Sequence, residues 1–150
     1  LELTEGDVID HDRIVAQVLA DAETYGVRQV AYDPNWGGDR VAVQLEAGGV
    51  EMYAFRQSKR MMTPVLSELD RLLGARLVDH GDNPLLAWCA ANLEVLTSSD
   101  GLMIPIKPKE TGRIDPIVAL LMALGSDLRV DDDGDSVYET TEREGGLLTL

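Results

Sequence analysis

The sequence predicts an α/β domain in which short parallel strands are covered by helices. Segments with helical spacing alternate with short apolar runs along the first two thirds of the chain, and this alternation is typical of strand–helix–strand units. At 150 residues, of which 45% are hydrophobic, the chain is long enough for one domain with a buried core and short for two. We therefore expect a single α/β domain.

The first half of the chain predicts two helices and two strands. Residues 11–25 carry apolar residues at helical spacing up to Gly26, which is a helix stop. A strand follows over 27–32, because that apolar run breaks at an Asp-Pro-Asn sequence. A second helix is expected over 39–47, before two glycines, and a second strand over 50–55. Strands that alternate with helices in this way become parallel neighbours in a sheet.

The second half of the chain predicts further helices at caps that are followed by proline. Thr63-Pro64 predicts the start of a helix of about ten residues, and Asn83-Pro84 predicts one that reaches about Leu93. A Ser-Ser-Asp-Gly turn at 98–101 then separates two short strands. The last helix is expected over 115–124.

The formal net charge is −14, from 27 acidic and 13 basic residues. Taken alone, this charge argues against nucleic acid as a partner, because phosphate binding depends on Lys and Arg. The charge is uneven, however. Residues 127–150 hold eight acids against two arginines, whereas residues 51–60 hold Arg56, Lys59 and Arg60 against one Glu. Overall charge therefore governs solubility and leaves the ligand open.

The sequence also indicates the cellular compartment in which the chain is expected. No stretch approaches the roughly 18 uninterrupted apolar residues of a membrane span, and the first residues lack the pattern of a signal peptide. Cys89 is the single cysteine, so there is no disulfide framework and a reducing cytosol fits. The chain begins with Leu1, and we expect it to be part of a longer protein.

Two aspartates are candidates for chemistry. Asp33 follows a predicted strand, and in parallel sheets ligands bind beyond the carboxyl ends of strands. Asp before Pro is also a common turn former. Asp115 is predicted to be the N-cap of the last helix, with Pro116 as its first residue. A capping carboxylate keeps a lone pair for a metal, so the structural and functional interpretations both remain open.

Other polar clusters have simpler interpretations beside the functional ones. Lys107, Lys109 and Arg113 lie in one loop, which is either a solvated loop or a phosphate contact beside a metal. His80 belongs to a segment that Asn83-Pro84 explains as a loop and cap, and two histidines with one cysteine cannot supply a zinc site. The acidic run at 131–142 resembles a calcium loop but has Ser136 where glycine is needed, so we interpret it as a solvated turn.

The order of several short motifs resembles the C-terminal nuclease domain of the large terminase subunit of tailed bacteriophages, the DNA-packaging motor. The resemblance covers about Gly6 to Gly125. The matching motifs, in order, are Tyr32-Asp33-Pro34, Arg56-Gln57, His80 with Asn83-Pro84, Trp88 with Asn92, Lys107, and Arg113-Ile114-Asp115 with Ala119. Each motif is short, and the specificity comes from their order.

This resemblance implies an α/β, ribonuclease-H-like nuclease fold, here without its N-terminal strand or strands. It implies carboxylates gathered around two divalent ions, Mg²⁺ or Mn²⁺, with Asp33 as the strand carboxylate and Asp115 at the start of the last helix. Hard oxygen ligands suit both ions. A third acid is expected upstream of Leu1, so the fragment would be incomplete for catalysis. Lys107, Lys109, Arg113 and Arg56 are the implied contacts to DNA phosphates.

The implied activity is endonuclease cleavage of concatemeric viral DNA during packaging. The implied partners are double-stranded DNA, the ATPase domain of the same full-length chain, the portal and the small terminase subunit, with no membrane, in the host bacterial cytoplasm. Residues 1–126 would be the partial nuclease domain and residues 127–150 an acidic tail. The negative charge suggests the hypothesis that DNA is bound tightly only when the motor presents it.

Two alternatives remain open. The chain is either a catalytically inactive prophage remnant or assembly module that docks on other packaging proteins, or an unrelated α/β domain. In the second case Asp33 would be only a turn former and Asp115 only a helix cap.

Overall fold

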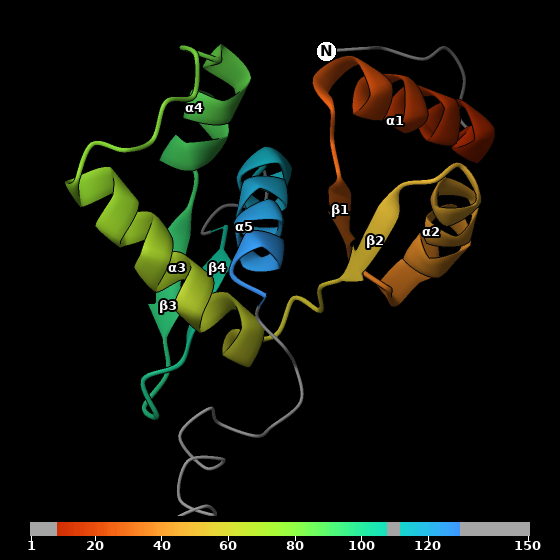
Figure 1. Ribbon diagram of the computed structural model, residues 1–150. Coiled ribbons are helices and arrows are strands. Elements are labelled where there is room, and N and C mark those ends of the chain that lie inside the picture. The colour runs from red at the N-terminus through yellow and green to blue at the C-terminus, as the bar shows by residue number, and fades with distance from the viewer. Residues whose placement is uncertain (1–8, 108–111, 130–150) are drawn as a thin grey trace, which may run out of the picture.

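The computed structural model describes residues 9–107 and 112–129. Helix α5 (Asp115–Asp127) stands between two groups of elements (Figure 1). One group contains α1 (His11–Tyr25), β1 (Gln29–Tyr32), the 3-10 turn η1 (Asn35–Gly37), α2 (Gly38–Ala47) and β2 (Glu51–Ala54). The other group contains α3 (Lys59–Gly74), α4 (Pro84–Ala91), β3 (Glu94–Thr97) and β4 (Met103–Ile106).

The predicted parallel pair of strands is confirmed. β1 and β2 pair in register from Gln29 with Glu51 to Tyr32 with Ala54. The Phe55 N–H extends the pairing by donating to the Tyr32 carbonyl at 2.8 Å. α5 lies on one face of this sheet, and α2, which packs against α1, lies on the other (Figure 1). Helices on both faces are what a parallel sheet requires.

The two strands predicted around the Ser-Ser-Asp-Gly turn form an antiparallel hairpin, β3–β4. The turn is closed by the Ser98 N–H, which donates to the Leu102 carbonyl at 2.8 Å. All four residues of β3 are exposed, whereas those of β4 are half-buried. β4 is held to α3 by Thr63, whose hydroxyl oxygen accepts from the Met103 N–H at 2.8 Å.

The predicted start of the third helix was wrong. α3 begins at Lys59, with Ser58 as its N-cap, and Pro64 lies inside the helix. Thr63 is therefore no cap; its hydroxyl donates to the Lys59 carbonyl at 2.6 Å. The physical reason is burial, because Met61 and Met62 are 1% and 0% exposed, and an earlier start brings both into the core.

The remaining boundaries differ less. α4 begins after the predicted cap, with the Asn83 side chain accepting from two backbone N–H groups, and it ends at Ala91. α5 extends to Asp127, beyond the expected Leu124. The acidic run at 131–142 lies outside the described residues. Within the described part of the chain, no helix has the length and apolar content of a membrane span.

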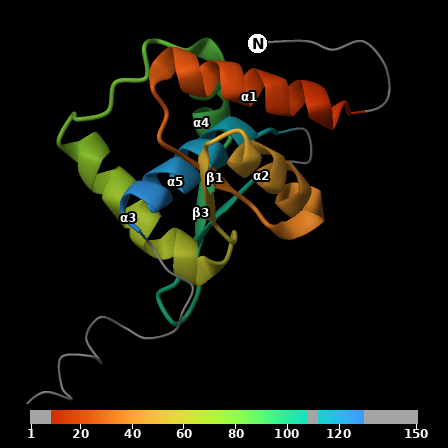
Figure 2. The ribbon, with the colours of Figure 1, turned by 45° about the vertical axis from the view of Figure 1, so that its right-hand side comes forward.

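The core lies where α3 meets α5 (Figure 2). Phe55, Val65 and Leu121 are each 0% exposed there. Gly125 allows the close approach of α5, because a Cβ at this position would lie 2.2 Å from Cε2 of Phe55. Cys89 of α4, a helix that also packs against α5, is likewise 0% exposed. The position of α5 therefore depends on packing along its whole length.

Candidate metal and phosphate site

Asp33 is held by a turn directly after β1. Its side chain is half-buried, and Oδ1 accepts from the Asn35 backbone N–H at 3.0 Å and from the Asn35 side-chain amide at 2.8 Å. This is the bonding of a turn-forming aspartate. One carboxylate oxygen is therefore engaged locally, and the turn interpretation of Asp33 is confirmed without excluding a further ligand on the carboxylate.

The chain folds back closely behind Asp33. A Cβ on Gly38 would lie 1.9 Å from the carbonyl oxygen of Asp33, so only glycine fits there. The Tyr32 hydroxyl donates to Oδ1 of Asp39 at 3.2 Å across the same turn. Burial raises the pKa of the Tyr32 phenol above its ordinary value, and the hydrogen bond to Asp39 and the charges of Asp39 and Glu46 raise it further.

Asp115 is not the N-cap of the last helix, which corrects the prediction. The cap position belongs to Ile114, whose side chain makes no capping bond and whose carbonyl accepts from the Val118 N–H at 2.9 Å. Asp115 is the first helical residue and Pro116 the second. Its carboxylate is exposed and sits where the N-terminal partial positive charge of α5 favours an anion.

A pocket of about 540 Å³ opens beside the start of α5. Three polar residues line it: Asp115, Lys107 at the end of β4, and Gln57 after β2. The apolar part of the lining comes from β4, α3 and α5 and consists of Met62, Ile104, Pro105, Ile106, Ile114, Val118 and Met122. The pocket thus joins a carboxylate and an ammonium group, from residues predicted for the site, with an amide that was not predicted.

Gln57 was missed as a site residue, although it follows the predicted Arg56 directly. Its side-chain amide donates to Sδ of Met122 at 3.8 Å, which turns it toward α5. The available signal was its membership in the Arg56-Gln57 motif of the family resemblance, shortly after β2. Sequence alone does not reveal that the chain brings this amide to a helix 65 residues away.

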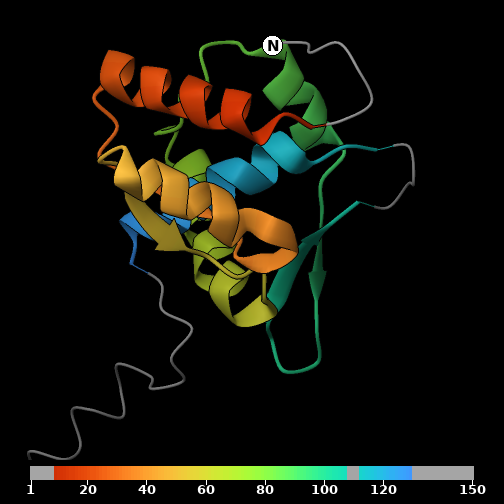
Figure 3. The same cartoon turned by 90° about the vertical axis from the view of Figure 1, so that its right-hand side faces the viewer.

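The direction of α5 determines where its two ends lie. Its last turn lines a second pocket, together with Gln29 and Glu51 at the starts of β1 and β2. α5 and β2 run in opposite directions (Figure 3), so Asp115 lies at the end of α5 that points toward the carboxyl ends of the strands. Asp33 lies after one of those ends but is not among the residues that line the pocket beside Asp115.

The four predicted basic residues differ in whether they line this pocket. Lys107 is exposed and lines it. Arg113 is exposed, and its guanidinium donates to the Gly112 carbonyl at 3.2 Å. Arg56 is exposed after β2 and does not line the pocket. Lys109 lies outside the described residues.

The donor chemistry here can be compared with what a divalent ion needs. Mg²⁺ and Mn²⁺ prefer hard oxygen ligands and are held by few protein carboxylates together with waters. Asp33 and Asp115 supply such oxygens. Among the described residues, however, no three His, Cys, Asp or Glu side chains gather as a metal-binding group. The carboxylate oxygens of Asp33 and Asp115 therefore suit a hard divalent ion in their chemistry.

The segment around His80 has the structural role that the sequence indicated. Oδ1 of Asn83 accepts from the backbone N–H groups of Leu85 and Leu86 at 3.0 and 3.1 Å, which caps α4. His80 is exposed, and its carbonyl accepts from the Asn83 N–H at 3.2 Å. This segment forms a loop and a cap, as predicted.

Comparison with known proteins identifies related chains. A sequence model of the family described as "Terminase large subunit, endonuclease domain" matches residues 1–130. The large terminase subunit of Enterobacteria phage HK97 is 30% identical over 128 residues, which are 84% of this chain and 25% of that protein. Protein YmfN of Escherichia coli K12 is 25% identical over 127 residues, which are 83% of this chain and 28% of that protein. The chain thus spans about a quarter of the length of these relatives.

Solved structures give the same relationship at the level of the fold. The crystal structure of the HK97 large terminase superposes with a TM-score of 0.71 at 30% identity, over 82% of this chain and 26% of that one. The large terminase nuclease from the thermophilic phage G20c superposes with a TM-score of 0.63 at 22% identity, over 79% of this chain and 63% of that one. The structure of the large terminase nuclease from phage G20c with bound magnesium superposes with a TM-score of 0.62 at 21% identity, over 77% of this chain and 61% of that one. The ribonuclease-H-like nuclease fold expected from the sequence is confirmed.

Proposed function

Because this chain belongs to the family of terminase large-subunit endonuclease domains, we propose that it contributes to metal-dependent cleavage of concatemeric viral DNA during genome packaging. The expected resemblance is thereby confirmed, and the family relationship extends over most of the chain.

Asp33 and Asp115 are the proposed metal-binding carboxylates. Asp33 would use the oxygen that its turn leaves available, since Oδ1 already accepts two hydrogen bonds from Asn35. Asp115 offers an exposed carboxylate at the first position of α5. A pair of Mg²⁺ or Mn²⁺ ions, when bound, would supply an activated water and stabilise the leaving oxygen of the phosphodiester. The chain's own part is to hold the two carboxylates in place.

The basic residues would orient the DNA backbone. Lys107 lines the same pocket as Asp115, so its ammonium group would contact a phosphate next to the ions. Arg56, Lys109 and Arg113 are assigned to phosphates further along the strand, because charged donors bind phosphate oxygens strongly. The observation that carries the proposal is the pocket that joins Asp115 and Lys107 in a member of a nuclease family.

Paramagnetic Mn²⁺ tests the metal assignment without requiring cleavage. In an NMR titration of the 150-residue chain, low Mn²⁺ concentrations should broaden first the amide signals near Asp33 and Asp115. Asp115→Asn and Asp33→Asn should each weaken that broadening, because the amide removes a negative oxygen ligand. The matched control is Asp127→Asn, which lies on the same helix about 18 Å from Asp115 at 1.5 Å per residue.

The outcomes separate clearly. Broadening at both carboxylates that Asp127→Asn leaves unchanged supports the site. Broadening that neither Asp33→Asn nor Asp115→Asn reduces would refute it. Supercoiled plasmid with Mn²⁺ gives the activity readout, and we expect little or no nicking by the chain alone, because only two carboxylates among the described residues are assigned to the metal.

The partners of the whole enzyme are proposals as well. The chain spans about a quarter of its curated relatives, so the ATPase domain is assigned to the remainder of a full-length protein. The portal and the small terminase subunit are the proposed assembly partners, and the host bacterial cytoplasm is the proposed location.

A second candidate function is an inactive module that docks on packaging proteins. One observation favours it: the described residues contain no group of three metal-ligating side chains. The Mn²⁺ titration decides between the two. A chain that binds no Mn²⁺ near Asp33 or Asp115, even at millimolar concentration, would be assigned to this second function.

A further inference from the structure

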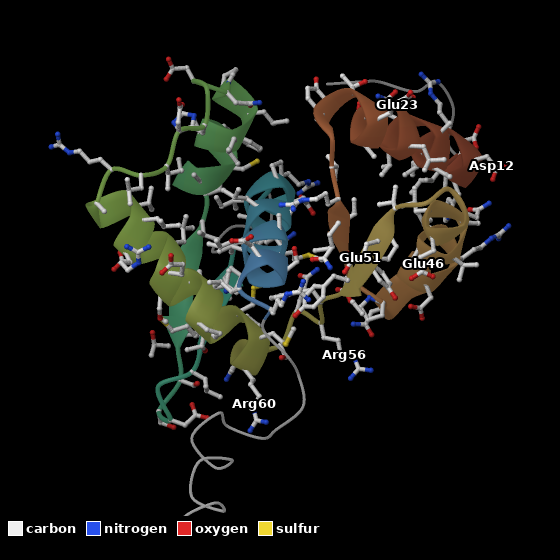
Figure 4. The ribbon with its side chains drawn as sticks, viewed as in Figure 1. Asp12, Glu23, Glu46, Glu51, Arg56 and Arg60 are labelled. Atoms are coloured by element: carbon white, nitrogen blue, oxygen red, sulfur yellow. The ribbon has the colours of Figure 1, made fainter. Side chains whose placement is uncertain are left out.

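A basic patch lies where β2 leads into α3. It consists of Arg56, Lys59 and Arg60, all exposed. Figure 4 shows Arg56 and Arg60 projecting from the same edge of the molecule. The pKa of Asp100, on the hairpin turn, is lowered chiefly by the hydrogen bond from Ser98, and the charge of Lys59 makes the smallest contribution. In a chain of net charge −14, a cluster of three cations is a strong local exception.

The end of the chain has the opposite charge. Seven acids and one arginine lie between residues 131 and 144: Asp131, Asp132, Asp133, Asp135, Glu139, Glu142 and Glu144, with Arg143. These residues lie outside the described part of the structure. They also lie beyond residue 130, where the match to the family model stops. The acidic segment therefore lies outside the part of the chain that the family model matches.

Packing brings the start of this segment close to the patch. Gly125 touches the ring of Phe55, since a Cβ there would lie 2.2 Å from Cε2, and Phe55 directly precedes Arg56. Asp131 follows Gly125 by only six residues, and six residues reach at most about 20 Å. The acidic segment is therefore attached at most about 20 Å from Gly125, which packs against the residue that precedes Arg56.

We propose that the acidic segment 131–144 binds the basic patch Arg56–Lys59–Arg60 within the same molecule and competes there with DNA phosphates. The part about competition rests on the proposed function, whereas the part about intramolecular binding does not. The segment is the occupant that fits best, because its charge is complementary and its attachment is adjacent.

Because the acidic segment is part of the same chain as the basic patch, even weak ion pairs between them can keep the contact formed. Exposed ion pairs contribute only about 0–1 kcal/mol each, so an untethered peptide of this composition would bind weakly. A short tether gives an effective concentration in the millimolar range. A contact with a dissociation constant several times below that concentration would be mostly formed, and DNA would have to displace it. The acidic residues of the segment would then act specifically at the basic patch, in addition to their contribution to the overall net charge of −14.

The test uses the full chain with its tail neutralised: Asp131→Asn, Asp132→Asn, Asp133→Asn and Asp135→Asn together. The matched control changes four exposed acids outside the tail by the same total charge: Glu23→Gln, Glu46→Gln, Asp70→Asn and Glu94→Gln. The first readout is the NMR signals of Arg56, Lys59 and Arg60 at about 50 mM salt, where screening is weak. They should move in the tail variant and not in the control.

The second readout is the affinity for a duplex of about 30 base pairs, measured by fluorescence anisotropy. The tail variant should bind about three- to tenfold more tightly, as expected when a competitor present at a few times its dissociation constant is removed. The dependence of log affinity on log salt should steepen by up to about 2.7, because three cations become available to phosphates. Arg71→Gln, at the far end of α3, should leave both results unchanged.

Each outcome decides a different point. Unchanged signals of Arg56, Lys59 and Arg60 in the tail variant overturn the proposal, whatever the DNA affinity does. An equal gain in affinity in the control variant also overturns it, since net charge alone would then explain the gain. Signals that move while neither protein binds DNA leave the intramolecular contact standing and count against the proposed function.

Discussion

The two candidate carboxylates are held in place by opposite means. Asp33 is fixed by its immediate neighbours, because Asn35 binds its side chain and Gly38 packs against its carbonyl. Asp115 has no comparable local support among the described residues, since the N-cap of its helix makes no side-chain bond. Its position depends on the packing of α5 against Phe55 and α3. This packing extends to Gly125, ten residues after Asp115 along the helix.

This difference predicts that the two halves of the site respond to different substitutions. A change in the turn after β1 should disturb Asp33 and leave the core intact. A change at the far end of α5 should disturb the core and Asp115 while leaving the turn unchanged.

The largest effect is expected for Gly125→Ala. The new Cβ would lie 2.2 Å from a ring carbon of Phe55, which is 0% exposed, so α5 or the ring must move. Overpacking of this kind costs about 3 kcal/mol of unfolding free energy, which urea unfolding would measure. Phe55→Leu should partly restore the stability of Gly125→Ala, because it removes the ring atoms that clash.

Gly74→Ala is the matched control for this change. Gly74 is also helical, and no atom lies within 4 Å of a Cβ placed on it, so the substitution should be neutral or slightly stabilising. If Gly125→Ala were equally harmless, the close contact between α5 and Phe55 would not be what positions Asp115.

A smaller effect on stability, but a sharper local one, is expected for Gly38→Ala. The added Cβ would lie 1.9 Å from the backbone oxygen of Asp33, and a backbone atom cannot rotate away. We expect a loss of about 1–2 kcal/mol and large changes in the NMR signals of Asp33 and Asn35. The signals of Leu121 and Met122 in α5 should stay in place; their movement would contradict separate supports.

The smallest effect concerns Tyr32, beside the turn. Its pKa is raised in the folded chain, chiefly by burial and then by the hydrogen bond to Asp39. Its neutral form therefore contributes stability that is complete below the ordinary tyrosine pKa and is lost as pH rises through the folded value. Tyr32→Phe should reduce the alkaline loss of unfolding free energy above about pH 10, measured against the wild type, because the ordinary tyrosine pKa is about 10. An identical loss in both proteins would exclude this contribution.

The local elements of the fold could be predicted from the sequence, whereas boundaries set by the core could not. The Asp-Pro-Asn break correctly indicated the end of β1, and Asn83 correctly indicated the cap of α4. Thr63-Pro64 was mistaken for a helix start because the burial of Met61 and Met62 against α5 is a tertiary effect. Asp115 was placed as a cap for a similar reason, since Asp followed by Pro is typical of a helix start but does not fix its register.

The candidate site divides in the same way. Asp33, Asp115 and Lys107 could be proposed from residue order and from the resemblance. The pocket that joins Lys107 to Asp115 could not, because it requires β4 and α5 to converge. Gln57 belonged to the matching Arg56-Gln57 motif, but its place in this pocket could not be predicted for the same reason: its bond to Met122 spans 65 residues. Contacts of long sequence separation are what a pattern search along one chain lacks.

The buried Cys89 provides a way to observe α4 in solution. Its thiol is 0% exposed on a helix that packs against α5, and it is the single cysteine of the chain. A thiol reagent can reach it only when α4 opens, so the labelling rate would measure the opening frequency of that helix under native conditions. The labelling rate of Cys89 would therefore report local unfolding next to the helix that carries Asp115.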